Sequence, residues 1–137
     1  MQTLTPNESD VLAVVRFHAA GYQFAIEASE VGAMIRGDIE QDEAIESLLG
    51  FPPAKPDTTR RSLALKGSGR RIMVSEPIEM NSIDSRNIHP IPALIRCRRH
   101  LPGLAALAIE QGQLCLLLEP LGLLSTEQNN TKLEKQP

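Results

Sequence analysis

The sequence predicts a mainly β protein, and three pairs of apolar runs carry that prediction. The first pair fills residues 11–28 around Gly21, the second joins 62–66 to 71–74, and the third joins 104–109 to 114–118. A short segment with a glycine separates the two runs of each pair, which is the pattern of a β-hairpin. Three such hairpins favour an antiparallel, barrel-like β protein.

The composition fits one small domain, or two small lobes that share a core. Of the 137 residues, 42% are hydrophobic and 23% are charged, as in ordinary globular proteins. Only 3% are aromatic, so aliphatic side chains must form the core. Few aromatics and a net charge of −3 argue against nucleic acid as a partner, because base stacking needs aromatic faces and phosphates attract positive charge.

Short helices are expected after the first hairpin. Residues 28–35 are expected to form one or two helical turns. Residues 42–50 predict a better helix, in which Asp42 caps the start, acids occupy the first turn and Gly50 ends it.

The second half of the chain is less regular. Residues 84–87 predict one helical turn, and residues 119–124 a final turn that closes the core. Pro77 predicts a strand end or a strand edge, because proline cannot donate to a sheet ladder.

Composition also divides the chain into segments. Three prolines in 52–61 indicate a linker between two halves, and both ends of the chain are polar. We predict a flexible arm (1–10), a single domain (11–124) with lobes at about 11–51 and 62–124, and a flexible tail (125–137).

Charge is unevenly spread along these segments. Residues 1–57 hold ten acidic and three basic side chains, whereas residues 58–124 hold nine basic and five acidic ones. Such asymmetry indicates two faces that meet different partners or each other.

No motif typical of an active site or a metal site is present, and we expect no metal and no other cofactor. His18, His89 and His100 lack the spacing of metal ligands. Cys97 and Cys115 stand alone, which favours two buried free thiols in a reducing compartment. Cys97 is flanked by arginines, which lower a thiol pKa, so a redox-sensing or enzymatic role for Cys97 is kept as an alternative.

The chain shows neither a signal peptide nor an apolar run long enough to span a membrane. We therefore expect a cytoplasmic protein without membrane insertion.

The order of motifs in the second half resembles a CheW-like domain. This family includes a bacterial chemotaxis coupling protein and the regulatory domain of its histidine kinase partner. Ile88, Pro90 and Pro92 match its Ile and Pro-x-Pro segment, Gly103 matches a strand glycine, and residues 123–124 match a closing Leu-Leu pair.

The first half carries the same resemblance. Phe17, Phe24, Ile26 and Val31 are in step with the opening hairpin of the family, and residues 45–52 resemble the helix that ends its first lobe. The resemblance implies a CheW-like fold of two small SH3-like β-barrel lobes with short helices.

The resemblance also implies that the first lobe is truncated. Between Met34 and Ile45 the family carries a further strand pair and a receptor-contact arginine, and this chain offers only ten residues there. About two strands of five or six residues are missing, so strand edges are expected to be unpaired.

A non-enzymatic adaptor of a bacterial chemosensory or motility pathway is the function that the resemblance implies. Its expected partners are signalling proteins such as a chemotaxis-type histidine kinase or a chemoreceptor, and a homodimer through unpaired strand edges is also expected. Val31 and Met34 match positions that line the receptor-binding crevice of the family, although both also fit the core.

The basic cluster Arg96, Arg98 and Arg99 is a second candidate for partner binding, and a solvated loop is its simpler interpretation. A small-ligand sensor that uses the crevice between the lobes is the remaining alternative for function.

Overall fold

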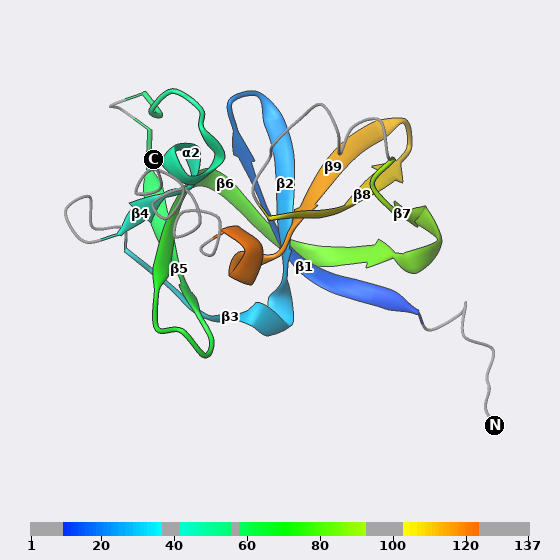
Figure 1. Cartoon of the computed structure of the whole chain (residues 1–137), viewed down its shortest axis with the longest axis horizontal. Helices are drawn as coiled ribbons and strands as arrows, with labels where there is room; N and C mark the ends of the chain where they lie inside the picture. The colour runs from blue at the N-terminus through cyan, green and yellow to red at the C-terminus, as the bar shows by residue number, and fades with distance from the viewer. Residues whose placement is uncertain (1–9, 37–41, 56–57, 93–102, 124–137) are drawn as a thin grey trace, which may run out of the picture.

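The computed structural model describes residues 10–36, 42–55, 58–92 and 103–123. Within these ranges the chain is mainly β, as predicted, with nine strands, the short α-helix α2, two 3-10 helices and a helical turn at 120–123 (Figure 1). In chain order the elements are β1 (Val11–Ala19), β2 (Tyr22–Glu27), η1 (Ala28–Glu30), β3 (Val31–Arg36), β4 (Glu43–Ala44), α2 (Ile45–Leu49), β5 (Arg60–Leu65), β6 (Arg71–Asp84), η2 (Ser85–Asn87), β7 (Ile88–His89), β8 (Leu104–Glu110) and β9 (Gln113–Leu118).

The strands form one mixed sheet in the order β3-β5-β6-β1-β2-β9-β8-β7, and β4 pairs with β6 beside this path. Most neighbours are antiparallel, but β2 with β9 and β4 with β6 are parallel. The expectation of a purely antiparallel protein is therefore wrong at two pairs. Parallel pairing joins segments far apart in sequence, so no local turn signal reports it.

The three predicted hairpins are confirmed as β1–β2, β5–β6 and β8–β9. In the first, the turn consists of Ala20 and Gly21, whose φ angles are 53° and 84°. In the third, Gln111 and Gly112 have φ angles of 50° and 78°. Positive φ at both central residues matches the right-handed twist of the flanking strands, which explains why two-residue turns suffice.

β6 is the longest strand and crosses the molecule from β4 and β5 to η2 and β7 (Figure 1). Its first five residues pair with β5, and its last six pair with β1. Pro77 lies where the partner changes, in a bulge between the pairs Arg16–Glu79 and His18–Ser75. The proline thus interrupts the ladder inside a strand rather than ending the strand, contrary to our expectation.

Two sequence-based helix assignments need correction. Only Ala28–Glu30 are helical in the segment 28–35, and β3 follows because its backbone pairs with β5. The helix α2 begins at Ile45, without the predicted cap from Asp42. Asp42 is instead buried, because Ser62 and Arg71 provide it with a hydrogen bond and an ion pair.

Other local predictions are confirmed. Gly50 ends α2 with φ of 80°, where only glycine is free of strain. The helical turn at 84–87 is η2, and the Asp84 side chain accepts a hydrogen bond from the Arg86 backbone N–H. A helical turn also begins at Pro120.

Buried apolar side chains form two clusters, to which β1, β2, β6 and β9 all contribute. The larger includes Phe17, Phe24, Ile45, Leu63 and Leu123, and the smaller includes Val14, Ile83 and Cys115. Aliphatic side chains predominate in both, as the composition predicted.

The boundaries of the two lobes and their barrel closure stay predictions. The predicted linker runs into β5, which begins at Arg60. Both predicted flexible ends fall almost wholly outside the described residues.

The close approach at Gly103 gives a first prediction. Its φ is +75°, and a Cβ there would lie 2.7 Å from Leu123 Cγ and 2.9 Å from Glu119 O. We expect Gly103→Ala to lower the free energy of unfolding by about 3 kcal/mol, since backbone strain and overpacking add. Urea denaturation measures the change.

Gly112→Ala is the matched control, because Gly112 has φ of +78° but nothing lies within 4 Å of a Cβ there. We expect this variant to lose only about 1 kcal/mol of stability, which is the cost of a positive φ for alanine. Equal losses for both variants would show that the contact of Gly103 with the C-terminal turn is not close.

Candidate functional site

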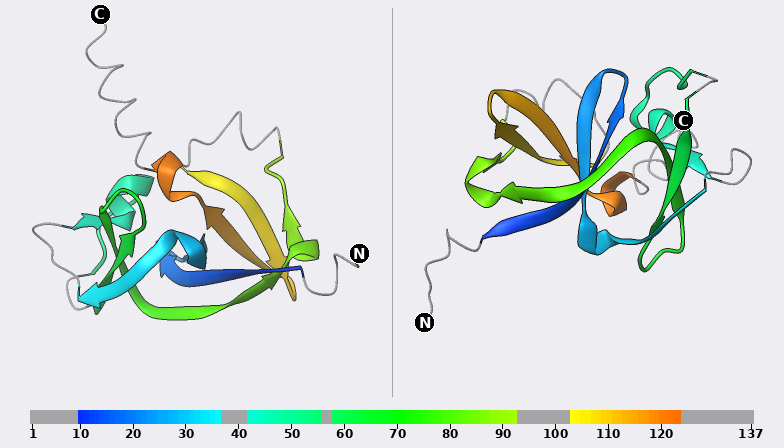
Figure 2. Two further views of the ribbon diagram at one scale, coloured as in Figure 1. Left: turned by 90° about the horizontal axis from the view of Figure 1, so that it is seen from below. Right: turned by 180° about the vertical axis from the view of Figure 1, so that it is seen from behind.

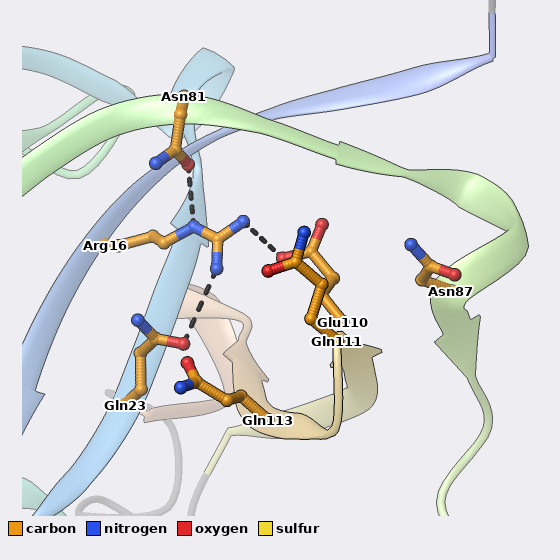
Figure 3. A pocket seen from close by; sticks show the side chains of 7 residues that line it. All are labelled: Arg16, Gln23, Asn81, Asn87, Glu110, Gln111 and Gln113. Carbon is orange, nitrogen blue, oxygen red and sulfur yellow. Dashed lines mark hydrogen bonds and ion pairs between the residues drawn. The ribbon is translucent and has the colours of Figure 1, made fainter.

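A polar pocket of about 360 Å³ lies where β1, β2 and β6 meet η2 and the β8–β9 hairpin (Figure 3). Its lining consists almost entirely of carboxamides and one ion pair. The residues are Arg16, Gln23, Asn81, Asn87, Glu110, Gln111 and Gln113.

Arg16 is the centre of this pocket. Its side chain is 10% exposed and forms an ion pair of 2.7 Å with Glu110. Its Nε donates to Asn81 Oδ1 at 2.6 Å, and one Nη donates to Gln23 Oε1 at 3.5 Å. Figure 3 shows these three partners around the guanidinium, with Asn87 beyond Glu110.

The arrangement suits recognition of a neutral polar group. Arg16 and Glu110 cancel each other in charge, and the carboxamides each offer both a donor and an acceptor. Such a lining can hydrogen-bond an amide or a hydroxyl-rich molecule, and it offers no aromatic face for stacking.

Cys115 lies buried in the smaller core cluster. Burial raises the pKa of its thiol to about 11, partly opposed by the positive charge of Arg16. A thiol with so high a pKa is a poor nucleophile. The sequence prediction of a buried free thiol is confirmed at Cys115, whereas Cys97 falls outside the described residues.

A second charged cluster joins the acidic half of the chain to the basic half. Glu43 pairs with Arg70 at 2.5 Å, and the buried Glu46 pairs with Arg60 at 2.9 Å. Acidic side chains from the first half of the chain are thus partly neutralised by arginines from the second half. Because these carboxylates and guanidinium groups pair with each other, we assign this cluster a structural role.

An exposed apolar row crosses three neighbouring strands. It consists of Tyr22 on β2, Leu114 on β9 and Ile109 on β8, which are 45%, 48% and 47% exposed. Ile109 pairs directly with Leu114, and Tyr22 lines one hollow together with Leu114. Adjacent exposed apolar side chains of this kind are typical of protein-binding surfaces.

The predicted partner residues Val31 and Met34 both lie in β3. They are half-buried, pack against the larger core cluster and stand opposite Leu65 and Leu63 of β5. Their predicted role in partner binding stays a prediction. Arg96, Arg98 and Arg99 lie outside the described residues.

Sequence reasoning missed the polar pocket. The one available signal was Arg16, a charged residue inside the apolar strand VLAVVRFHA. An arginine at a buried strand position needs partners, but those partners come from three other strands, β2, β6 and β8, and local sequence does not connect β6 or β8 with Arg16.

Among the described residues, no three His, Cys, Asp or Glu side chains gather closely enough to hold a metal ion. In the same ranges, no helix has both the length and the hydrophobicity needed to cross a lipid bilayer.

Comparison with known proteins gives a clear structural likeness. The chain matches no protein-family model, and no curated protein matches its sequence. Its structure is similar to the crystal structure of the scaffolding protein TtCheW from Thermoanaerobacter tengcongensis, with a TM-score of 0.62. The match covers 79% of this chain and 88% of TtCheW at 13% sequence identity.

The fold is CheW-like. This confirms the resemblance that hydrophobic spacing and the order of motifs indicated. At 13% identity the likeness concerns the fold alone.

The environment of Cys115 gives a second prediction. In a Cys97→Ser variant at pH 8, we expect the native thiol to react with a chromogenic disulfide at least ~100-fold more slowly than in urea, because the thiolate is the reactive form. Rapid labelling of the native variant would contradict the raised pKa. A Cys115→Ser variant, labelled in parallel, tests the redox alternative for Cys97.

The raised pKa of Cys115 also makes the stability of the fold depend on pH. The folded state favours the neutral thiol, whereas the unfolded thiol ionises from its ordinary value of 9.0, so stability should fall as the pH rises from there towards about 11. Cys115→Ser should remove this part of the pH dependence.

Proposed function

We propose that the chain is a non-enzymatic adaptor of a bacterial chemosensory or motility signalling system, acting through protein–protein binding. The observation that carries the proposal is the likeness to the scaffolding protein TtCheW over 79% of the chain. A chemotaxis-type histidine kinase and a chemoreceptor are the proposed partners, and the cytoplasm is the proposed compartment.

The surface of the chain supports a binding role. The exposed apolar row on β2, β9 and β8 offers area that a partner can bury, and binding energy is usually concentrated in a few such side chains. The basic cluster Arg96, Arg98 and Arg99 remains a proposed second contact, which would act through charge.

Binding to these partners gives the third prediction. The full chain should co-sediment with a chemoreceptor cytoplasmic fragment or a chemotaxis histidine kinase from the same organism. The double change Ile109→Ser with Leu114→Ser should weaken binding at least ~10-fold, because it removes two exposed apolar contacts without disturbing the core. Melting temperatures check that the variant is folded.

Val11→Ser with Met80→Ser is the matched control, since both residues are exposed and apolar but lie outside the row. It should leave binding unchanged. Arg96, Arg98 and Arg99 changed together to alanine should weaken capture with little loss of stability. Failure of the unmodified chain to bind either partner would contradict the proposal.

Recognition of a small ligand is a second candidate function, favoured by the polar pocket. The neutral, carboxamide-rich lining suits a molecule that pairs donors with acceptors, such as an amino-acid amide or a neutral sugar.

Thermal melting with added probes gives the fourth prediction. Glutamine, asparagine and neutral sugars should raise the melting temperature, whereas glutamate and lysine should not, since ligand binding to the native state alone stabilises it. Asn87→Ala with Gln113→Ala should abolish the shift, because both side chains line the pocket. No shift with any neutral probe would count against a ligand site.

A further inference from the structure

The nine-stranded sheet has two ends, and they differ in how well they are protected. One end is β7, which has two residues and is followed by Pro90 and Pro92. A short strand next to prolines is a poor template for another strand. The other end is β3, which has six residues and contains neither proline nor lysine.

β3 pairs with β5 along one side and with no other strand in the described part of the chain. The left view of Figure 2 shows β3, in cyan, along the edge of the sheet. Gly32 and Ala33 are exposed, and because glycine has no side chain and alanine only a methyl group, another backbone can approach them closely. An unprotected edge of this length is able to accept a further strand.

The charges at the two ends of β3 are complementary. Glu30 immediately precedes the strand, and Arg36 is its last residue. Both are exposed. Arg36 is the one arginine in the described ranges that lacks an ion pair, whereas Arg16, Arg60, Arg61, Arg70, Arg71 and Arg86 each have one.

A second copy of this chain is the partner that this edge fits. In antiparallel self-pairing about Ala33, each Arg36 lies at the end of the ladder where Glu30 precedes the strand of the other copy, so the same two opposite charges come close together twice. A twofold contact requires such self-complementarity. The bulge between Val31 and Ala33 does not prevent this approach, because the extra residue is Gly32, which has no side chain to clash.

We propose that two copies of the chain associate through antiparallel pairing of β3, with Ala33 facing Ala33 across the twofold axis. This self-association extends the sheet across both copies. It does not depend on the proposed adaptor role, because it rests only on the edge and its charges. The strand is short, so the dimer is expected to be weak and concentration-dependent.

Disulfide trapping in the full chain tests the proposed register and is the fifth prediction. In a Cys97→Ser background, Ala33→Cys should form a disulfide-linked dimer under mild oxidation, because directly opposed residues on antiparallel strands lie at a distance that a disulfide can span. Ile35→Cys, which lies away from the twofold axis, and the exposed Ile109→Cys are the controls and should cross-link at least ~10-fold more slowly. Equal cross-linking of all three variants would overturn the proposal.

Exchanging the charges of Arg36 and Glu30 tests the same self-association independently. In sedimentation, Arg36→Glu should weaken self-association at least ~10-fold, and adding Glu30→Arg should restore it, because the pair is then reversed. Lys55→Glu changes the net charge equally at an exposed site away from β3 and should have no effect. A chain that stays monomeric at high concentration, or a double variant that fails to recover, would overturn the proposal.

Discussion

The pairing of β6 with three other strands is the constraint on which the rest of the structure depends. This strand pairs with β5 and β4 at its start and with β1 at its end, and the partner changes at Pro77. Because a ladder fixes the face of every side chain, this single strand sets which residues reach each core cluster. It also positions residues of the charged cluster and of the polar pocket. Arg71 begins the strand and forms an ion pair with Asp42, and Asn81 near its end accepts a hydrogen bond from Arg16.

The pairing of β5 with β6 also decides which charged side chains meet. Burying a carboxylate is costly unless a cation or a donor accompanies it, and the β5–β6 hairpin brings arginines to the acidic segment around α2. The pairs Glu46–Arg60 and Asp42–Arg71 join chain segments that the sequence shows as oppositely charged halves. Among the residues that the structure describes, Arg36 on β3 has no ion-pair partner, which is why the edge strand stands out as a surface for association.

The CheW-like fold at 13% identity to TtCheW illustrates what is retained when sequences diverge. A sheet needs apolar residues at the right spacing and turns that reverse the chain, and many residue types satisfy both. Residues that contact partners are under no such structural constraint. The likeness to TtCheW therefore concerns the fold, and contacts with partners have to come from surfaces of this chain, such as the row of Tyr22, Leu114 and Ile109.

Local chemistry in the sequence by itself determined the three hairpins, the glycine that ends α2, the turn at η2 and the aliphatic core. Each depends on neighbours within a few residues, and the order of these elements was enough to indicate a CheW-like fold. Only the tertiary structure decided that Val31–Arg36 form an edge strand, that Asp42 is buried beside Arg71 and that β2 and β9 run parallel. The polar pocket around Arg16 belongs to the same group. These features depend on pairing between residues distant in sequence, and the free energy of such pairing overrides local propensity without leaving a local signal.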